Sequence, residues 1–490
     1  MRVPCCALAA LALAASAFAA DPPPPNLAAR LDALADAPIA ARASLGIHVL
    51  DLKTGKTLYA RNENRFFLPA SNMKIFTGAL ALEKLGANYR FVTRLVRDPA
   101  GNLVLVGSGD PSLSGRTYPY KKDAAPGNPL RAIEELAAQA VAAGLTEVNG
   151  DVAGDDRRYP WSPYPPSWTQ EDAAGEDGAP VSALTLNDNL INVTIRPGPL
   201  GEPALLTLAP ALEYFAIDNR VTTVAGKADP RIHVDRVPGT RQVLLSGSMP
   251  AGAMPVREIV AMDDPALFAA CALYDALTRR GVVIRGRPVA WHRAEGEPAP
   301  PVTGEILARR TSPPLKDLLQ MLEKVSENLH AELVLRETGH MAKPSGTHDP
   351  GSREAGLDAL AALIKQTGGV EEDYRLEDGS GLSRNAQVTP RLVTRMLAHM
   401  WDSPEHDTWL TLLPVGGEDG TLANRLCCVA DASHAIVAKT GTLARALALS
   451  GYADSKTNGR LAFSILVNNF AAPANSVRAW IDKMALALVD

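Results

Sequence analysis

Cysteine is scarce in this chain, and its distribution argues against a disulfide-stabilised fold. Only five of the 490 residues are cysteines, and three of them follow the N-terminal leader: Cys271, Cys427 and Cys428. An odd number does not build a disulfide framework, and adjacent cysteines rarely pair because the bridge would be strained. We expect all three thiols to be unpaired and largely buried. The sequence leaves open a bridge from Cys271 to one of the other two.

The chain also lacks blocks of positive charge and long apolar runs. Its formal net charge is −5 and its isoelectric point about 6.0, so neither nucleic acid nor an anionic membrane is an expected partner. No stretch after the leader reaches the ~18 apolar residues that a membrane helix needs. The cysteines do not have metal-ligand spacing to histidine, and we expect no metal ion or other cofactor.

The first clear positive signal is for export. Residues 1–20 combine a basic start, a short apolar stretch and a small-x-small end at Ala17-Phe18-Ala19, which is the pattern that signal peptidase accepts. We expect cleavage near Ala19 or Ala20 and a soluble protein in the periplasm. The alternative is a buried N-terminal helix.

Periodicity divides the remaining chain into an α/β body at both ends and a β-rich middle. Residues 45–58 have the pattern of two strands joined by a turn at Lys53-Thr54-Gly55. A helical pattern runs from Ser71 to a stop at Gly86. Short β-like runs divided by proline and glycine fill residues 181–260. Helical patterns return at residues 264–280 and 315–338.

The predicted fold class is therefore α/β (α+β), with one body split by a nested insertion. The expected segments are a signal peptide (1–20), the α/β body (24–92 and 305–490), an outer inserted domain (93–178 and 256–304) and an inner β-rich domain (179–255).

The first candidate for chemistry is Ser71-Asn72-Met73-Lys74, the one Ser-x-x-Lys in the chain. Residues three apart share a helix face, so the Lys74 amine can reach the Ser71 hydroxyl. A free lysine with a pKa of ~10.4 is neutral in only about one molecule in two thousand at pH 7. The site must therefore lower that pKa, by burial and by a second cation. The alternative is a helix start that Ser71 merely caps.

The second candidate is Ser326-Glu327-Asn328, in a region of helical character. The Ser326 hydroxyl can relay a proton to a leaving amine, and the Asn328 amide can hold both Lys74 and a peptide group of the substrate. Ser383-Arg384-Asn385 also fits Ser-x-Asn, so neither copy is specific by itself.

The third candidate is Lys439-Thr440-Gly441-Thr442, which a run of β-forming residues enters directly, as the edge strand of a cleft requires. Lys439 supplies the second cation. Thr440 and Thr442 can bind a terminal carboxylate, and Gly441 leaves room for a substrate strand.

The backbone N–H groups of Thr442 and Ser71 are expected to form an oxyanion hole, in which losing one donor costs ~2.7–4 kcal/mol. A second Lys-Thr-Gly, at residues 53–55, lacks the apolar run before it and reads as a hairpin turn.

Ser-x-x-Lys, Ser-x-Asn and Lys-Thr-Gly in this order are the motifs of penicillin-binding proteins and class A β-lactamases. With them, the chain resembles the class C low-molecular-mass penicillin-binding proteins, the D-Ala-D-Ala carboxypeptidase/endopeptidase family (peptidase S13, penicillin-binding protein 4 type). The resemblance covers nearly the whole mature chain. Further segments that carry it are residues 107–113, 150–156, 179–184, 187–189, 378–384, 413–417 and 419–422.

The resemblance implies a β-lactamase/DD-peptidase-like catalytic domain, with a central antiparallel sheet flanked by helices and interrupted by two nested domains. It implies that Ser71 attacks the D-Ala-D-Ala carbonyl of peptidoglycan stem peptides, and that water hydrolyses the acyl-enzyme. β-Lactams are then covalent inhibitors. Glu327 stands where aspartate is more usual in the family, and we expect this outward position to matter little. Assembly into a homo-oligomer stays open.

For the substrate's side chain we expect opposite charges on Asp155 or Asp156 and on Arg384. Together they would hold the zwitterionic end of a diaminopimelate residue. The alternative is that the aspartates are turn residues and Arg384 a surface ion-pair partner.

Three other functions fit less well. A β-lactamase would have a compact body and a deacylating glutamate, and a Ser-His-Asp esterase would have Gly-x-Ser-x-Gly, which does not occur in the chain. A module that binds penicillin or peptidoglycan with little turnover would not need Lys74, Asn328 and Lys439 all intact.

Overall fold

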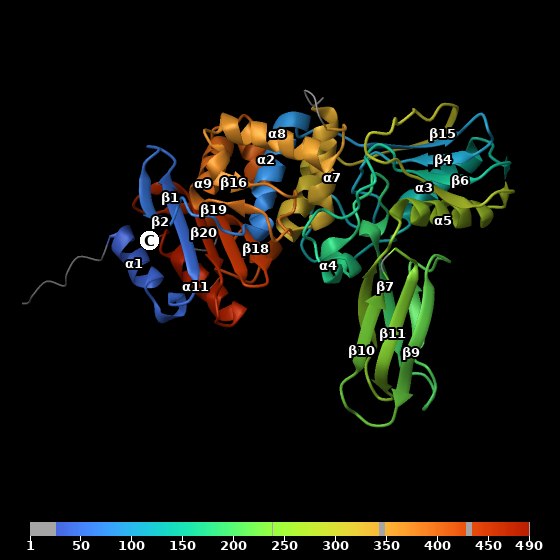
Figure 1. Cartoon of the computed structure of the whole chain (residues 1–490), viewed down its shortest axis with the longest axis horizontal. Coiled ribbons are helices and arrows are strands. Elements are labelled where there is room, and N and C mark those ends of the chain that lie inside the picture. Colours follow the sequence, from blue (N-terminus) through green and yellow to red (C-terminus); the bar gives the residue numbers. More distant parts are fainter. Residues whose placement is uncertain (1–25, 238, 343–347, 428–433, 490) are drawn as a thin grey trace, which may run out of the picture.

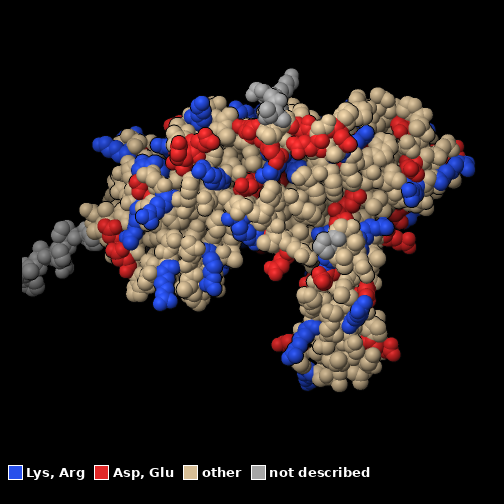
Figure 2. Space-filling model, viewed as in Figure 1, with Lys and Arg blue, Asp and Glu red and all other residues tan. Residues whose placement is uncertain are grey.

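The computed structural model describes residues 26–237, 239–342, 348–427 and 434–489. The expected signal peptide and Cys428 lie outside these residues. Within them, no helix has the length and apolar character needed to cross a membrane. Acidic and basic side chains are intermixed over the face seen in Figure 2, as the small net charge leads one to expect.

A five-stranded antiparallel sheet joins the two ends of the chain. Its strand order is β18-β19-β20-β1-β2, and β1 pairs with β20 from Ser44↔Asn468 to Asp51↔Leu461. β1 and β2 form the predicted hairpin, and β18 is the predicted edge strand. The bounds are β1 (Ser44–Asp51), β2 (Thr57–Arg61), β18 (Ile436–Leu443), β19 (Ala446–Ser455) and β20 (Gly459–Asn468).

Helices cover both faces of this sheet (Figure 1). α1 and α11 pack on one face, against a core that includes Leu31, Ile47 and Trp480. The other helices build a larger core around α2, whose residues from Met73 to Leu82 are all buried. The bounds are α1 (Leu27–Ala35), α2 (Met73–Leu85), α6 (Leu315–Gln320), α7 (Asn328–Met341), α8 (Arg353–Gln366), α9 (Pro390–Trp401), α10 (His406–Leu412) and α11 (Ala474–Leu486).

The insertion has a mixed five-stranded sheet of its own, in the order β14-β6-β4-β3-β15, with α3 and α5 packed beside it (Figure 1). The bounds are β3 (Val92–Arg97), β4 (Leu103–Val106), α3 (Arg131–Ala142), β6 (Val152–Asp155), α5 (Pro265–Thr278), β14 (Pro288–Trp291) and β15 (Glu305–Thr311). Shorter elements of the insertion are the strand pair β5 (Glu147–Val148) and β13 (Val283–Ile284) and the helix α4 (Gln170–Ala174). In the body, the short strands β16 (Tyr374–Arg375) and β17 (Gln387–Val388) pair with each other.

The β-rich part of the insertion projects from the molecule as a separate lobe (Figure 1). Two three-stranded sheets form it, in the orders β10-β11-β9 and β12-β7-β8. Val193, Val221 and Leu245 belong to a core that continues into the mixed sheet. The bounds are β7 (Leu190–Arg196), β8 (Leu205–Ala209), β9 (Ala216–Val224), β10 (Arg231–Arg236), β11 (Gln242–Pro250) and β12 (Val256–Ala261).

Two strands lie across the boundaries expected from sequence. β15 pairs with β3 of the insertion, whereas the second body segment predicted from sequence begins at residue 305. β12 pairs with β7 of the lobe, whereas the sequence places residue 256 in the outer inserted domain. Both pairings are non-local, so the apolar pattern within each strand does not reveal them. We propose that the lobe extends through β12 and that the body resumes after β15.

The cysteine prediction is right for one residue and wrong for another. Cys271 on α5 is half-buried and forms no disulfide with any described residue, and burial raises the pKa of its thiol to about 11. Cys427, in contrast, is exposed.

Candidate active site

Ser71 lies in a single helical turn, Ala70–Asn72, that leads directly into α2. The turn is held tightly. Ala70 adopts a left-handed φ of 46°, and a Cβ on Gly381 would lie only 1.9 Å from the Ala70 carbonyl oxygen. The Asn72 side chain donates to the carbonyl of Lys439 at 2.9 Å, which ties the turn to β18. Backbone strain of this kind is typical of sites that hold a reactive group in one position.

Lys74 is completely buried, and its ammonium group has three acceptors. Nζ donates to Ser71 Oγ at 3.0 Å, to Asn328 Oδ1 at 2.6 Å and to the carbonyl of Ser380 at 3.0 Å. Burial lowers the pKa of Lys74 to about 8, although nearby carboxylates led by Glu323 oppose the shift. At pH 7 about one molecule in ten then carries a neutral amine. Burial thus supplies the lowered pKa that the sequence argument required, but the expected second cation, Lys439, does not contribute to it; instead, burial and the charge of Lys74 lower the pKa of Lys439 to about 7.

The second motif lies where a helix is interrupted. α6 continues as a π-helical turn, Met321–Val325, and Ser326 then takes a left-handed φ of 70° before α7 begins at Asn328. The region is helical as predicted, but it is not one helix. The break turns the Ser326 hydroxyl toward Lys439, whose Nζ donates to it at 2.8 Å. Asn328, at the start of α7, reaches Lys74 instead.

The third motif lies on β18, at the edge of the body's sheet. Lys439 is completely buried, and the Thr440 hydroxyl donates to Thr421 Oγ1 at 2.8 Å. A Cβ on Gly441 would lie 2.8 Å from the carbonyl oxygen of Pro69 and 3.2 Å from Ala70 Cβ. The turn that carries Ser71 therefore leaves little room for a side chain at this position, which also lines the cavity.

The three motifs open onto one cavity of about 470 Å³. Seven of the eleven residues expected in the site line this cavity. Its lining includes Ser71, Ser326, Asn328, Thr440, Gly441, Thr442 and Arg384. Lys74 and Lys439 lie behind this lining and reach it through Ser71 and Ser326.

A strap from the insertion, residues 167–178, borders the cavity. The Asp177 carbonyl accepts a hydrogen bond from Asn328 Nδ2 at 2.9 Å, and Trp168 Nε1 donates to Asp378 Oδ2 at 3.0 Å. Arg384 forms an ion pair with Asp172. The insertion therefore contributes directly to the cleft, and it orients the Asn328 amide with its oxygen toward Lys74.

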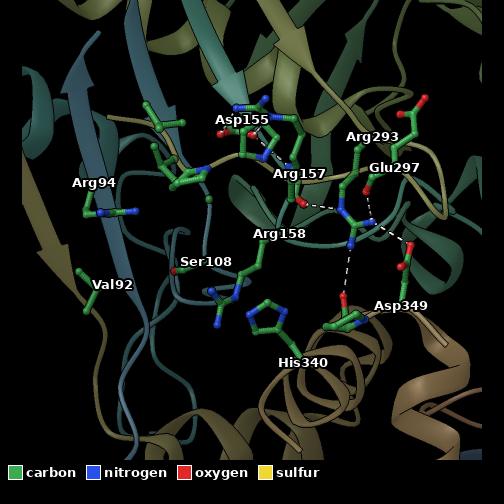
Figure 3. Close-up of a pocket in the computed structure, with 17 residues that line it drawn as sticks. Val92, Arg94, Ser108, Asp155, Arg157, Arg158, Arg293, Glu297, His340 and Asp349 are labelled. Atoms are coloured by element: carbon green, nitrogen blue, oxygen red, sulfur yellow. Dashed lines mark hydrogen bonds and ion pairs between the residues drawn. The ribbon is translucent and has the colours of Figure 1, made fainter. Parts of the chain in front are cut away.

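Asp155 is not in this cavity. It ends β6 and forms a two-pronged ion pair with Arg157 at 2.8 and 3.0 Å. Both residues line a different cavity of about 390 Å³, together with Arg94, Arg293 and other residues (Figure 3). Asp155 therefore does not line the cavity that Arg384 lines, and its carboxylate is paired with Arg157.

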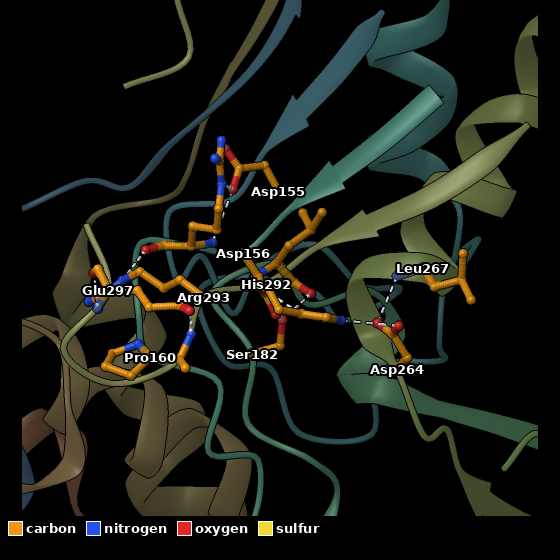
Figure 4. Close-up of polar contacts among 12 residues, drawn as sticks. Asp155, Asp156, Pro160, Ser182, Asp264, Leu267, His292, Arg293 and Glu297 are labelled. Atoms are coloured by element: carbon orange, nitrogen blue, oxygen red, sulfur yellow. Dashed lines mark hydrogen bonds and ion pairs between the residues drawn. The ribbon is translucent and has the colours of Figure 1, made fainter. Parts of the chain in front are cut away.

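Asp156 is buried in a polar network (Figure 4). Its carboxylate accepts from Ser182 Oγ and contacts His292 Nδ1, both at 2.9 Å, while His292 Nε2 contacts Asp264 at 3.2 Å. Although burial opposes the charge, these two carboxylates raise the pKa of His292 to about 10. Asp156 thus connects β6 to β14 and to the start of α5, and it does not face Arg384. Asp172 is the carboxylate that does.

The prediction that Glu327 faces outward is wrong, because its side chain is buried. Its carboxylate accepts a hydrogen bond from the Arg116 guanidinium at 2.5 Å, and the same guanidinium forms an ion pair with Asp188 at 2.8 Å. The middle residue of the Ser-x-Asn motif therefore joins the catalytic body to the insertion.

Four groups of the site were not assigned a role from sequence: Asp172, the Asp177 and Ser380 carbonyls, and Thr421. Ser380 and Thr421 belong to segments that carry the family resemblance, which was a usable signal. Asp172 and Asp177 lie in a stretch without a motif, and main-chain carbonyls have no sequence signature. Among the described residues, no group of three or more His, Cys, Asp and Glu is arranged to hold a metal ion.

Comparison with known proteins decides the family. The model of the D-Ala-D-Ala carboxypeptidase 3 (S13) family matches residues 27–488. The chain belongs to this family. Membership of the S13 family confirms the recognition made from the three motifs, and with it the predicted enzyme class, a serine-type D-Ala-D-Ala carboxypeptidase.

Individual relatives of the chain support the same family assignment. The S13 chain is 36% identical over 463 residues to a D-alanyl-D-alanine carboxypeptidase of Actinomadura sp., covering 91% of this chain and 81% of that protein. It is 22% identical over 438 residues to D-alanyl-D-alanine carboxypeptidase DacB of Haemophilus influenzae, covering 87% and 86%. The crystal structure of penicillin binding protein 4 (dacB) from H. influenzae superposes with a TM-score of 0.78 at 21% identity, covering 93% of this chain and 97% of that one. This likeness confirms the predicted fold class.

Proposed function

We propose that this protein removes the terminal D-alanine of peptidoglycan stem peptides, and also cleaves D-alanyl cross-links, through an acyl-enzyme on Ser71. The observation that carries the proposal is the buried Lys74 amine, 3.0 Å from the Ser71 hydroxyl and at the same time 2.6 Å from Asn328. A lysine in this setting is a base of suitable strength for removing the proton of a serine.

In the acylation step, neutral Lys74 takes the Ser71 proton as Oγ attacks the carbonyl carbon of the penultimate D-alanine. The negative oxygen of the tetrahedral intermediate is bound by the N–H groups of Ser71 and Thr442. When the carbon–nitrogen bond breaks, the proton held by Lys74 returns to the leaving amine through the Ser326 hydroxyl. D-Alanine, or the second strand of a cross-link, departs, and no net proton leaves the site.

Deacylation repeats the same chemistry with water in place of Ser71. Lys74 takes a proton from water, the hydroxide attacks the ester carbonyl, and Ser71 Oγ leaves with the returned proton. A β-lactam enters the first half of this cycle, but its leaving nitrogen stays attached to the acyl group. It therefore remains in the cleft and hinders water, which makes β-lactams inhibitors.

Substrate recognition divides between two parts of the cleft. The terminal carboxylate binds to Lys439, Thr440 and Thr442 on β18, because hydrogen bonds to an ionised carboxylate are stronger than those between neutral groups. Arg384 with Asp172 presents a cation and an anion in one place, which suits a side chain that ends in an amine and a carboxylate. Asp172 replaces Asp155 and Asp156 in this role.

The cell wall lies outside the cytoplasm, so the proposal requires export. The pattern of residues 1–20 supports removal of a signal peptide near Ala19 or Ala20 and delivery to the periplasm.

Turnover of diacetyl-Lys-D-Ala-D-Ala tests the proposal. We expect release of D-alanine by the wild-type protein and none by Ser71→Ala, with both proteins melting at similar temperatures. Acylation by penicillin without any release of D-alanine would favour a binding module instead, and release by Ser71→Ala at the wild-type rate would refute the assignment of the nucleophile.

A further inference from the structure

A buried ion pair ties the residue next to Ser326 to the insertion. Glu327, which immediately precedes α7, accepts a hydrogen bond from Arg116 Nη2 at 2.5 Å, and the two side chains are only 6% and 22% exposed. α7 lies on the side of the body that faces the insertion (Figure 1). The acyl-transfer steps make no use of this pair, although Glu327 directly follows the serine that returns the proton to the leaving amine.

The backbone conformation of Ser326 needs support from its surroundings. Its φ of 70° lies in the left-handed region, which a residue with a side chain adopts only where neighbouring contacts hold it. On the N-terminal side, the Ser326 N–H closes the π-helical turn on the Met321 carbonyl. On the C-terminal side, the next residue is Glu327, whose side chain is held by Arg116. The ion pair is therefore the side-chain anchor of the chain directly after the turn.

Arg116 is itself fixed from a second side. Its Nε donates to Asp188 Oδ2 at 2.8 Å, and Asp188 Oδ1 lies 3.4 Å from Nε2 of His330, which is fully buried in the first turn of α7. The guanidinium thus bridges two carboxylates, a task that suits the planar fork of arginine better than the single ammonium group of lysine. Because contacts on both sides restrict Arg116, the position that it gives to Glu327 is well defined.

The hydroxyl that this turn presents must return a proton to the leaving amine. Lys439 Nζ donates to Ser326 Oγ at 2.8 Å, which orients the hydroxyl but does not fix the backbone that carries it. An amine does not leave as an anion, so the carbon–nitrogen bond breaks only when a correctly placed donor delivers the proton. General acid catalysis of this kind contributes about 10²–10⁴-fold, and a misplacement of about 1 Å costs about a hundredfold.

We propose that Arg116 is a positioning residue: by anchoring Glu327, it holds Ser326 where the serine hydroxyl protonates the leaving amine. The insertion thus takes part in the chemistry through one arginine that does not touch the substrate. The inference rests on the function proposed above and adds to it a residue outside the catalytic body on which the proton transfer depends.

Glu327→Ala tests this, because it removes the anchor and leaves Arg116 paired with Asp188. The measurement is kcat/KM for two substrates that differ only in the leaving group, diacetyl-Lys-D-Ala-D-Ala and its thioester analogue that ends in D-thiolactate. A thiol has a pKa of ~8.5, so the thiolate leaves without a proton from Ser326. We expect kcat/KM to fall about thirtyfold on the amide and less than about threefold on the thioester.

Glu327→Gln should keep the amide rate within about threefold of wild type, because its side-chain oxygen can still accept from Arg116. Glu337→Ala is the matched control. Glu337 is a fully buried carboxylate that pairs with an insertion arginine, Arg158, at 2.6 Å, but it lies in the second half of α7, away from Ser326. We expect Glu337→Ala to lower the melting temperature while the ratio of the amide rate to the thioester rate stays at the wild-type value.

Equal losses on the two substrates in Glu327→Ala would show that the ion pair only supports the fold and would overturn the proposal, as would an unchanged amide rate in the folded variant. If Glu327→Ala does not fold, Arg116→Lys carries the same expectation, since it keeps a positive charge beside the two carboxylates without the planar fork. A wild-type protein that turns over neither substrate would refute the proposed function, which is a different result from equal losses.

Discussion

Replacing Asn328 by aspartate is the substitution whose effect on the base can be worked out most directly. The side chains have the same shape, and Asn328 Oδ1 lies 2.6 Å from Lys74 Nζ. The change therefore places a negative charge in contact with a completely buried ammonium group. It also removes the donor to the Asp177 carbonyl, a loss that does not depend on pH.

The magnitude follows from the pKa of Lys74, which burial lowers to about 8. An opposite charge in contact raises a lysine pKa by roughly one to three units. For a shift of two units, the neutral fraction at pH 7 falls about ninetyfold, and at pH 9 it falls about tenfold. Acylation of Asn328→Asp by penicillin should therefore be about two orders of magnitude slower than that of the wild type at pH 7. The ratio of the two rates should be about tenfold smaller at pH 9 than at pH 7.

Stopped-flow acylation with a fluorescent penicillin at several pH values measures this ratio. Asn385→Asp, the same change at the exposed asparagine of the second Ser-x-Asn motif, is the control and should leave the profile unchanged. A ratio of wild type to Asn328→Asp that stays constant from pH 7 to pH 9 would refute the claim that Lys74 is the base.

Three further outcomes are expected. Arg384→Gln should lower kcat/KM about tenfold for a stem peptide with a diaminopimelate side chain, but not for diacetyl-Lys-D-Ala-D-Ala; equal losses on both substrates would argue against the pairing with Asp172. Gly441→Val should slow acylation about a hundredfold, because its Cβ must displace the turn that carries Ser71 and a shift of about 1 Å costs that much; an unchanged rate would contradict the tight packing. His292→Gln should destabilise the protein in urea more at pH 6 than at pH 10. The raised pKa of His292 contributes stability that is complete below about 6.5 and is lost as the pH rises through 10, so an equal loss at both pH values would refute the charged network with Asp156.

The sequence predicted the parts of the site in which local spacing carries the chemistry. Ser71 and Lys74 share a helix face because they are three residues apart, and Lys439 follows a run of β-forming residues on what proved to be an edge strand. The β1–β2 hairpin, with its turn at Lys53-Thr54-Gly55, is local in the same sense. In each case the residues that form the sequence pattern and the structure that the pattern predicts lie in the same short segment.

The rest depends on contacts between distant segments. β12 and β15 pair with strands of parts other than those assigned to them, and nothing in their own alternation indicates the partner. Arg384 lines the cleft, but its ion-pair partner, Asp172, comes from an insertion whose position is set by packing between distant segments. Glu327 was misjudged for the same reason, because its partner Arg116 lies far away in the chain.

The central claim is that three distant segments form one cleft in which Ser71 is the nucleophile and Lys74 its base. The most direct test is mass spectrometry of the protein after incubation with benzylpenicillin, followed by peptide mapping. The account predicts a single adduct of one intact penicillin on the peptide that contains Ser71, and no adduct in Ser71→Ala. An adduct on another residue, or equal labelling of the folded Ser71→Ala protein, would contradict it.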